Sequence, residues 1–193
     1  VWASGNRRAR RREKDFARHS VDWYRIVLET IDMRSFSNMW FWIALAVVWS
    51  TASHWVLGVP FDMVMRARRH GGQAERDLED MVRINVNRIL LITGEAGVWG
   101  VALASALLSM LAVSGFGYAV ELSQALFLLA FPMSLVGLMS IGTAERIRGE
   151  GLAGEALRRK LASHRFWVQV IGLISILVTA LWGMAQNMSF AVL

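Results

Sequence analysis

Residues 89–141 read ILLITGEAGVWGVALASALLSMLAVSGFGYAVELSQALFLLAFPMSLVGLMSI, and this stretch decides the fold. It consists of two apolar blocks, Ile89–Val113 and Tyr118–Ile141, which only the four residues Ser114–Gly117 separate. About 20 helical residues, at about 1.5 Å each, cross the hydrocarbon core of a bilayer, which is about 30 Å thick. Each block is therefore long enough to span a membrane, and together they predict a transmembrane helical hairpin.

The composition of the whole chain indicates the same class. Its 193 residues are 55% hydrophobic, and the apolar residues are gathered into blocks rather than spread at helical period. Cysteine is absent, which excludes disulfides, thiolate nucleophiles and cysteine-ligated metals on this chain. The net charge is +6, but the basic residues flank the apolar blocks and no nucleic-acid-binding motif accompanies them. We therefore predict the lipid bilayer, and not a nucleic acid, as their partner.

Two further apolar blocks, 39–59 and 166–185, complete the predicted architecture. The fold class is all-α, a polytopic transmembrane helical bundle with four spans plus interfacial amphipathic helices, and the membrane domain covers 37–193. Tryptophans stand near the ends of both blocks, as in the aromatic belts at the headgroup level of a bilayer. The predicted interface anchors are Trp40, Trp42, Trp55, Trp167 and Trp182.

The N-terminal part of the chain divides into two segments. Residues 1–20 carry a dense group of arginines, which predicts a disordered basic arm or, alternatively, a contact with anionic lipid. Residues 21–36 place charged and apolar side chains on opposite sides of a helix. We predict an interfacial amphipathic helix there, and packing on the chain's own bundle is the alternative.

The distribution of positive charge predicts the orientation. Of the 21 Lys and Arg residues, nine precede residue 37, six lie in 59–88 and six in 142–165. Basic residues close to the spans face the cytoplasm, so the charged connections 60–88 and 142–165 are predicted to be cytoplasmic. Four spans then place both termini in the periplasm. In the alternative, 39–59 dips into the membrane and returns, which is disfavoured because lipid-exposed irregular backbone is costly.

Small residues recur at four-residue spacing within the spans and predict close packing of helices. Pro132 lies inside the second block and predicts a kink. The predicted packing residues are Ala96, Gly100, Ala104, Ala130, Ser134, Ser175, Thr179 and Gly183.

His54 and Glu95 are the candidate intramembrane polar pair. Both lie a few residues inside spans that flank the same charged connection, so they are expected at similar depth. If the two helices are neighbours, an imidazole–carboxylate pair satisfies both groups, either as a proton-responsive site or simply as a hydrogen bond between helices.

Motifs of catalysis are not found. The chain has no metalloprotease motif, phosphate-binding loop or nucleophile elbow, and its four histidines have no second ligand at metal spacing. We therefore predict no enzyme activity, no catalytic residues, no metal site and no cofactor.

Four segments carry a resemblance to a known family: IDMRSFSN (31–38), WIALAVVWSTASHWVLGVPFDMV (42–64), ARRHGG (67–72) and RINVNRIL (83–90). The chain resembles a family of small bacterial integral-membrane proteins labelled "component of SufBCD complex", over about residues 21–165 and most strongly in the first half. The resemblance implies a link to iron–sulfur cluster assembly, in which a chain without cysteine anchors or regulates the machinery.

Two functions follow as expectations. The first is a non-enzymatic accessory, anchor or scaffold subunit in the bacterial inner membrane, with other membrane or membrane-associated proteins as partners. Its host complex is the iron–sulfur assembly system or a respiratory or photosynthetic complex. The second is a small transporter or channel that works through His54 and Glu95.

Overall fold

A computed structural model describes residues 39–191, of which 91% are helical. The predicted basic arm (1–20) and amphipathic helix (21–36) lie outside the described residues. The elements are α2 (Met39–His54), β1 (Trp55–Val56), β2 (Val59–Pro60), α3 (Phe61–His70), α4 (Gly72–Ala112), the π-helical turn η1 (Val113–Gly117), α5 (Glu121–Gly149) and α6 (Gly154–Ala191).

Three helical segments of the described chain are long and apolar enough to cross a membrane: Gly72–Gly117, Glu121–Gly149 and Gly154–Met188. They contain the predicted spans 89–113, 118–141 and 166–185, and they indicate a membrane protein. The described part of α2, from Met39 to His54, has 16 residues and is about 24 Å long. Within residues 39–191 the structure thus gives three candidate spans, where the sequence predicts four.

The block 39–59 differs from the single span predicted for it, because its helix ends at His54. The chain then forms a two-stranded antiparallel hairpin in which Val56 pairs with Val59. Leu57 and Gly58 between them have φ values of 52° and 75°, the pattern of a type I′ turn. Apolar composition alone does not distinguish this buried hairpin from the last turn of a membrane helix.

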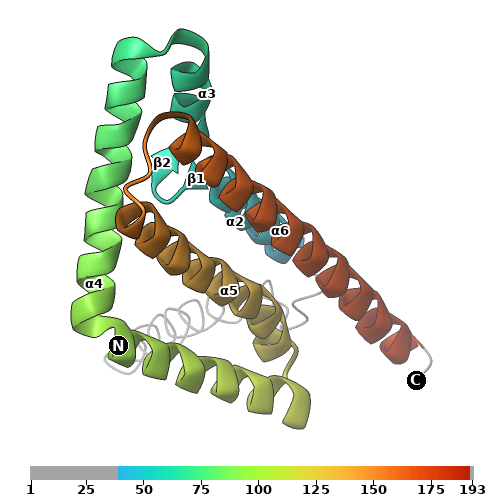
Figure 1. The fold of residues 1–193 in the computed structure, drawn as a ribbon. Coiled ribbons are helices and arrows are strands. Elements are labelled where there is room, and N and C mark those ends of the chain that lie inside the picture. Colours follow the sequence, from blue (N-terminus) through green and yellow to red (C-terminus); the bar gives the residue numbers. More distant parts are fainter. Residues whose placement is uncertain (1–38, 192–193) are drawn as a thin grey trace, which may run out of the picture.

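α4 and α6 are continuous from charged into apolar sequence. α3 ends at Gly71, which has a φ of 57°. α4 bends near the middle of its length (Figure 1), where Gly94 and Gly97 lie and the Thr93 hydroxyl donates to the carbonyl of Ile89 (2.8 Å). α6 begins at Gly154 and runs without a break through the end of the charged connection 142–165 into the apolar block 166–185.

The main hydrophobic core lies at the charged end of the molecule, not among the apolar spans. The β1–β2 hairpin is enclosed by α3, the first half of α4, the end of α5 and the start of α6 (Figure 1). The side chain of Asn85 holds it there, donating to the carbonyls of Met81 (3.0 Å) and Gly58 (3.4 Å). The core comprises Val56, Leu57, Val59, Val64, Ala67, Leu78, Val82, Val86, Ala144, Ile147, Leu157 and Leu161.

α2 packs on α6 through a tryptophan and a glycine. Trp49 is buried, and a Cβ atom added at Gly172 would lie 2.7 Å from its ring. The absence of a side chain at Gly172 therefore permits the two helices to approach closely.

Substitution of Gly172 with alanine is expected to force Trp49 out of its position and to cost about 1–3 kcal/mol of stability. Thermal unfolding in detergent, followed by circular dichroism, measures the effect. Gly137→Ala is the matched control, because a Cβ there meets no atom within 4 Å. Equal unfolding temperatures for the two variants would show that the Trp49–Gly172 contact does not limit α2 packing.

Candidate functional site

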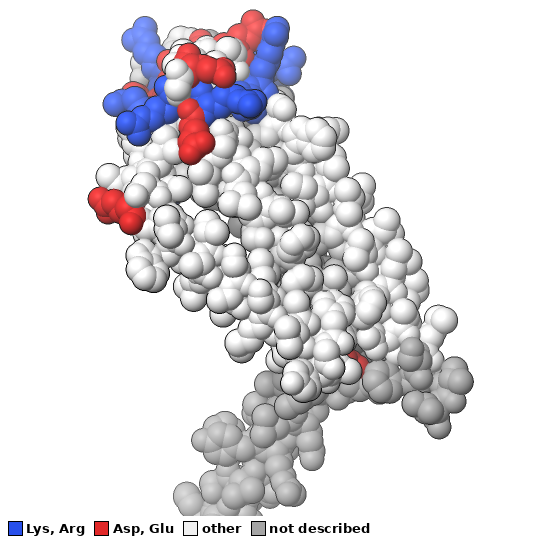
Figure 2. All heavy atoms as spheres, turned by 60° about the horizontal axis from the view of Figure 1, so that its bottom comes forward, with Lys and Arg blue, Asp and Glu red and all other residues white. Residues whose placement is uncertain are grey.

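Charged residues gather at one end of the molecule, and most of the remaining visible surface is free of them (Figure 2). The segments 60–88 and 142–165, which contribute to this charged end, contain twelve Lys and Arg residues against eight Asp and Glu residues. The charged end therefore has a net positive charge, and it encloses the hydrophobic core described above. It is a folded unit and not a pair of loose loops.

Two glutamates on α4, Glu75 and Glu79, join α4 to the start of α6. The backbone N–H of Gly154 donates to Oε1 of Glu79 (2.7 Å), and Arg158 forms an ion pair with Glu75. The glutamates are four residues apart and so lie on one face of α4. A carboxylate at a helix N-terminus satisfies a free N–H group and interacts favourably with the helix dipole. These contacts fix the orientation of α6 relative to α4.

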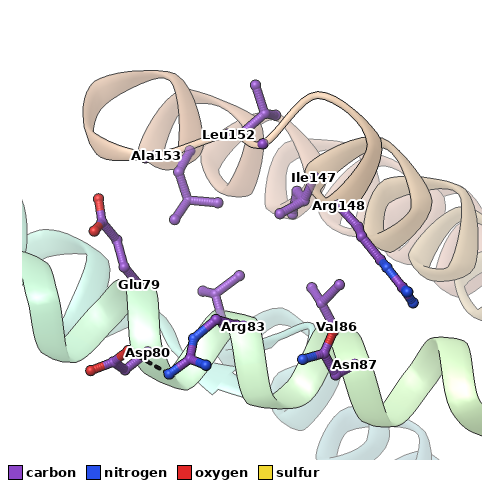
Figure 3. A pocket seen from close by; sticks show the side chains of 12 residues that line it. Glu79, Asp80, Arg83, Val86, Asn87, Ile147, Arg148, Leu152 and Ala153 are labelled. Carbon is purple, nitrogen blue, oxygen red and sulfur yellow. Dashed lines mark hydrogen bonds and ion pairs between the residues drawn. The ribbon is translucent and has the colours of Figure 1, made fainter.

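A cavity of about 470 Å³ lies between α4 and the α5–α6 connection (Figure 3). Glu79 and Ala153 stand at one end of it, and Arg148 stands on the opposite side from α4. Asp80 and Arg83 form an exposed ion pair along α4 (2.9 Å). The lining of the cavity combines acidic and basic side chains with valine and leucine, and this combination points to no particular reaction.

Replacing Glu79 with alanine is expected to lower the free energy of unfolding by about 0.5–2 kcal/mol, because the Gly154 N–H loses its acceptor. Glu79→Gln retains an acceptor oxygen and is expected to lose less. Thermal unfolding in detergent ranks the variants, and Glu145→Ala on exposed α5 surface is the control. A loss for Glu79→Ala no larger than that of the control would contradict the capping role.

A buried imidazole ties α5 to α6. His164 is buried, with Nδ1 3.1 Å from the Thr143 hydroxyl and Nε2 3.4 Å from the Ser140 hydroxyl. The Thr143 and Ser140 hydroxyls donate to the carbonyls of Met139 and Val136 (2.8 Å each), so each can only accept from the ring. A neutral imidazole has one N–H, and it therefore donates to one of the two hydroxyls. This cluster escapes sequence reasoning because its members lie 21 and 24 residues apart and match no motif.

The structure does not bring His54 and Glu95 together. Both side chains are exposed, and no hydrogen bond or ion pair joins them among the described residues. Asn85 of α4 contacts the hairpin that follows His54, and Glu95 lies ten residues, about 15 Å, further along α4. The proton-responsive pair remains a prediction without a supporting contact.

The predicted packing residues of α4 face a groove. Ala96, Gly100 and Ala104 are exposed and line an apolar groove of about 490 Å³ between α4 and α5, to which Ser134 also contributes. In α6, by contrast, Ser175 and Thr179 are buried, and the Ser175 hydroxyl donates to the carbonyl of Leu128 (3.4 Å). Gly183 of α6 is also buried, and Ala130 of α5 is half-buried.

The predicted tryptophan anchors have different environments. Trp40, Trp55 and Trp167 are exposed, as expected of side chains that meet a membrane interface, and Trp42 is half-buried against Phe41. Trp182 instead has an internal role, because its indole N–H donates to Gln124 (3.0 Å).

Gln124 is the centre of a polar network at the end opposite the charged residues. Its Oε1 accepts hydrogen bonds from Trp182 and from Gln186 (3.1 Å), and its Nε2 donates to the carbonyl of Gly115 (2.8 Å). The side chain is buried, and its contacts join η1, α5 and α6. Buried amides need such partners, so this network fixes the hairpin tip on α6.

Comparison with protein-family models, curated proteins and solved structures found no match to this chain. Within residues 39–191, no group of three or more His, Cys, Asp or Glu side chains is placed to hold a metal ion.

Proposed function

We propose that this protein is a non-enzymatic accessory subunit that anchors or scaffolds a larger complex in a bacterial inner membrane. The observation that carries the proposal is the folded charged end. Its hydrophobic core is internal, while its outer surface presents both signs of charge with an excess of positive charge (Figure 2). A rigid, hydrophilic surface of this kind suits a protein partner with an acidic surface.

The proposed topology places the charged end in the cytoplasm and both termini in the periplasm, in line with the positive-inside rule. α2 serves as the fourth crossing. The apolar part of α4 supports an accessory role in a different way. None of its most apolar stretch is buried within the chain, so this face is open to lipid or to the spans of other subunits.

The resemblance to the family labelled "component of SufBCD complex" suggests iron–sulfur cluster assembly as the host system. A respiratory or photosynthetic membrane complex is the other proposed host. In either case the chain contributes position and orientation, since it has no cysteine with which to hold a cluster.

Purification of the full chain from its native membranes in mild detergent tests the proposal. The expected result is a partner at fixed stoichiometry that is lost, in large part, when Arg76 and Arg146 are both changed to glutamate. These two arginines are exposed on α4 and α5. Glu145→Lys is the control of opposite sign and is expected to retain the partner. A wild-type chain that purifies alone, as monomer or homo-oligomer, would contradict the proposal.

A further inference from the structure

We propose that a second cavity at the charged end binds the phosphate-bearing headgroup of an anionic phospholipid. This cavity has a volume of about 510 Å³ and lies among the end of α2, helix α3 and α6. Its lining includes three arginines, Arg66, Arg69 and Arg165, against a single carboxylate, Asp62. The inference does not depend on the proposed accessory role.

The positive charge of the cavity is not neutralised within the described chain. None of its three arginines forms an ion pair with a described residue. Arg66 and Arg69 are three residues apart on α3, so they lie on one face of the helix, where like charges repel. An anion bound between them would remove this repulsion and would be held by charge-assisted hydrogen bonds.

Arg165 is prepared for a ligand in a further way. Its guanidinium carbon lies 3.9 Å from the centre of the Phe61 ring, and its Nε is buried without a hydrogen-bond partner in the described structure. Stacking on an aromatic ring occupies one face of the guanidinium and leaves its edge N–H groups available. Planar, fork-like donors of this kind match the geometry of a phosphate.

The position of the cavity selects a lipid rather than a free anion. His54 is the last residue of apolar α2, and Arg165 directly precedes the apolar block 166–185. The neighbouring residues Trp55 and Trp167 are 50% and 53% exposed, as in a belt at the headgroup level. Basic pockets between membrane helices on the cytoplasmic side are places where anionic headgroups bind.

Native mass spectrometry of the full-length protein in detergent tests this proposal, with phosphatidylglycerol, phosphatidylcholine and inorganic phosphate as probes. The wild type is expected to retain phosphatidylglycerol in preference to phosphatidylcholine. Changing Arg66, Arg69 and Arg165 to glutamine is expected to reduce its affinity by about fivefold per arginine. The control carries the same three substitutions at Arg76, Arg88 and Arg146, which are exposed and lie outside the cavity.

A second variant keeps the proposal falsifiable if the triple variant does not fold. Asp62→Asn removes the only carboxylate of the lining without changing its shape, and it is expected to increase phosphatidylglycerol retention by about fivefold. The proposal would be overturned if the wild type retained phosphatidylcholine as well as phosphatidylglycerol. It would also be overturned if the triple variant and its control lost phosphatidylglycerol equally, or if Asp62→Asn retained no more of this lipid than the wild type. Binding of inorganic phosphate that phosphatidylglycerol does not displace would overturn the lipid assignment.

Discussion

Leu161→Ala is expected to lower the free energy of unfolding by about 2–5 kcal/mol, the range observed when a buried leucine is truncated and a cavity remains. Leu161 is 0% exposed and packs with residues of the hairpin, α3, α4 and α5 in the core of the charged end. A loss of this size is a large fraction of the stability of a small protein. The charged end is therefore expected to loosen as a unit.

Leu177→Ala on the same helix is the matched control, because Leu177 is 57% exposed on the apolar part of α6. Thermal or denaturant unfolding in detergent, followed by circular dichroism, compares the two. If the core is packed as described, Leu161→Ala lowers the free energy of unfolding much more than Leu177→Ala does. Similar losses would mean that the charged end is not a packed unit.

Gly115→Ala is expected to produce the second large effect, about 1–3 kcal/mol or more, at the opposite end of the molecule. A Cβ atom at Gly115 would lie 2.9 Å from the backbone nitrogen of Gln124. Backbone cannot give way as a flexible side chain can, so η1 and the start of α5 have to separate. The hydrogen bond from Gln124 to the carbonyl of Gly115 is then lost, and the contacts of Gln124 with α6 weaken.

Gly117→Ala in the same turn is the control, because a Cβ there lies 3.9 Å from the nearest atom, in Val113. Unfolding temperatures in detergent compare the two variants. If Gly115→Ala is as stable as Gly117→Ala, the tip is not held by the close approach of η1 to Gln124.

The apolar blocks of the sequence predicted the three long spans, because their length and composition are set by the thickness of a bilayer. The same criterion extended the first block through Val56 and Val59, whose apolar side chains fit a membrane helix as well as a buried hairpin. What places them in the charged end is the contact between Asn85 and Gly58, 27 residues apart. Such a contact has no signature in local periodicity.

The polar contacts at the charged end could not be predicted from the sequence either. Glu79 meets the N-terminus of α6 across 75 residues, and both residues look like ordinary solvated positions in the sequence. His54 and Glu95 were paired because their spans flank one connection. That argument predicts only that the two side chains lie at a similar depth. A contact also requires that the two helices are neighbours and are rotated so that the side chains face each other. The β1–β2 hairpin after His54 alters both conditions.

Labelling of single cysteines in intact cells tests the central claim most directly, that the charged end faces the cytoplasm. The chain has no cysteine of its own, so each introduced thiol is the only one on the chain. With a membrane-impermeant maleimide, Asp77→Cys and Glu150→Cys at the charged end are expected to react only after the membrane is permeabilised. Ser114→Cys at the hairpin tip is expected to react in intact cells. Labelling of position 77 or 150 in intact cells, with protection of position 114, would contradict the account.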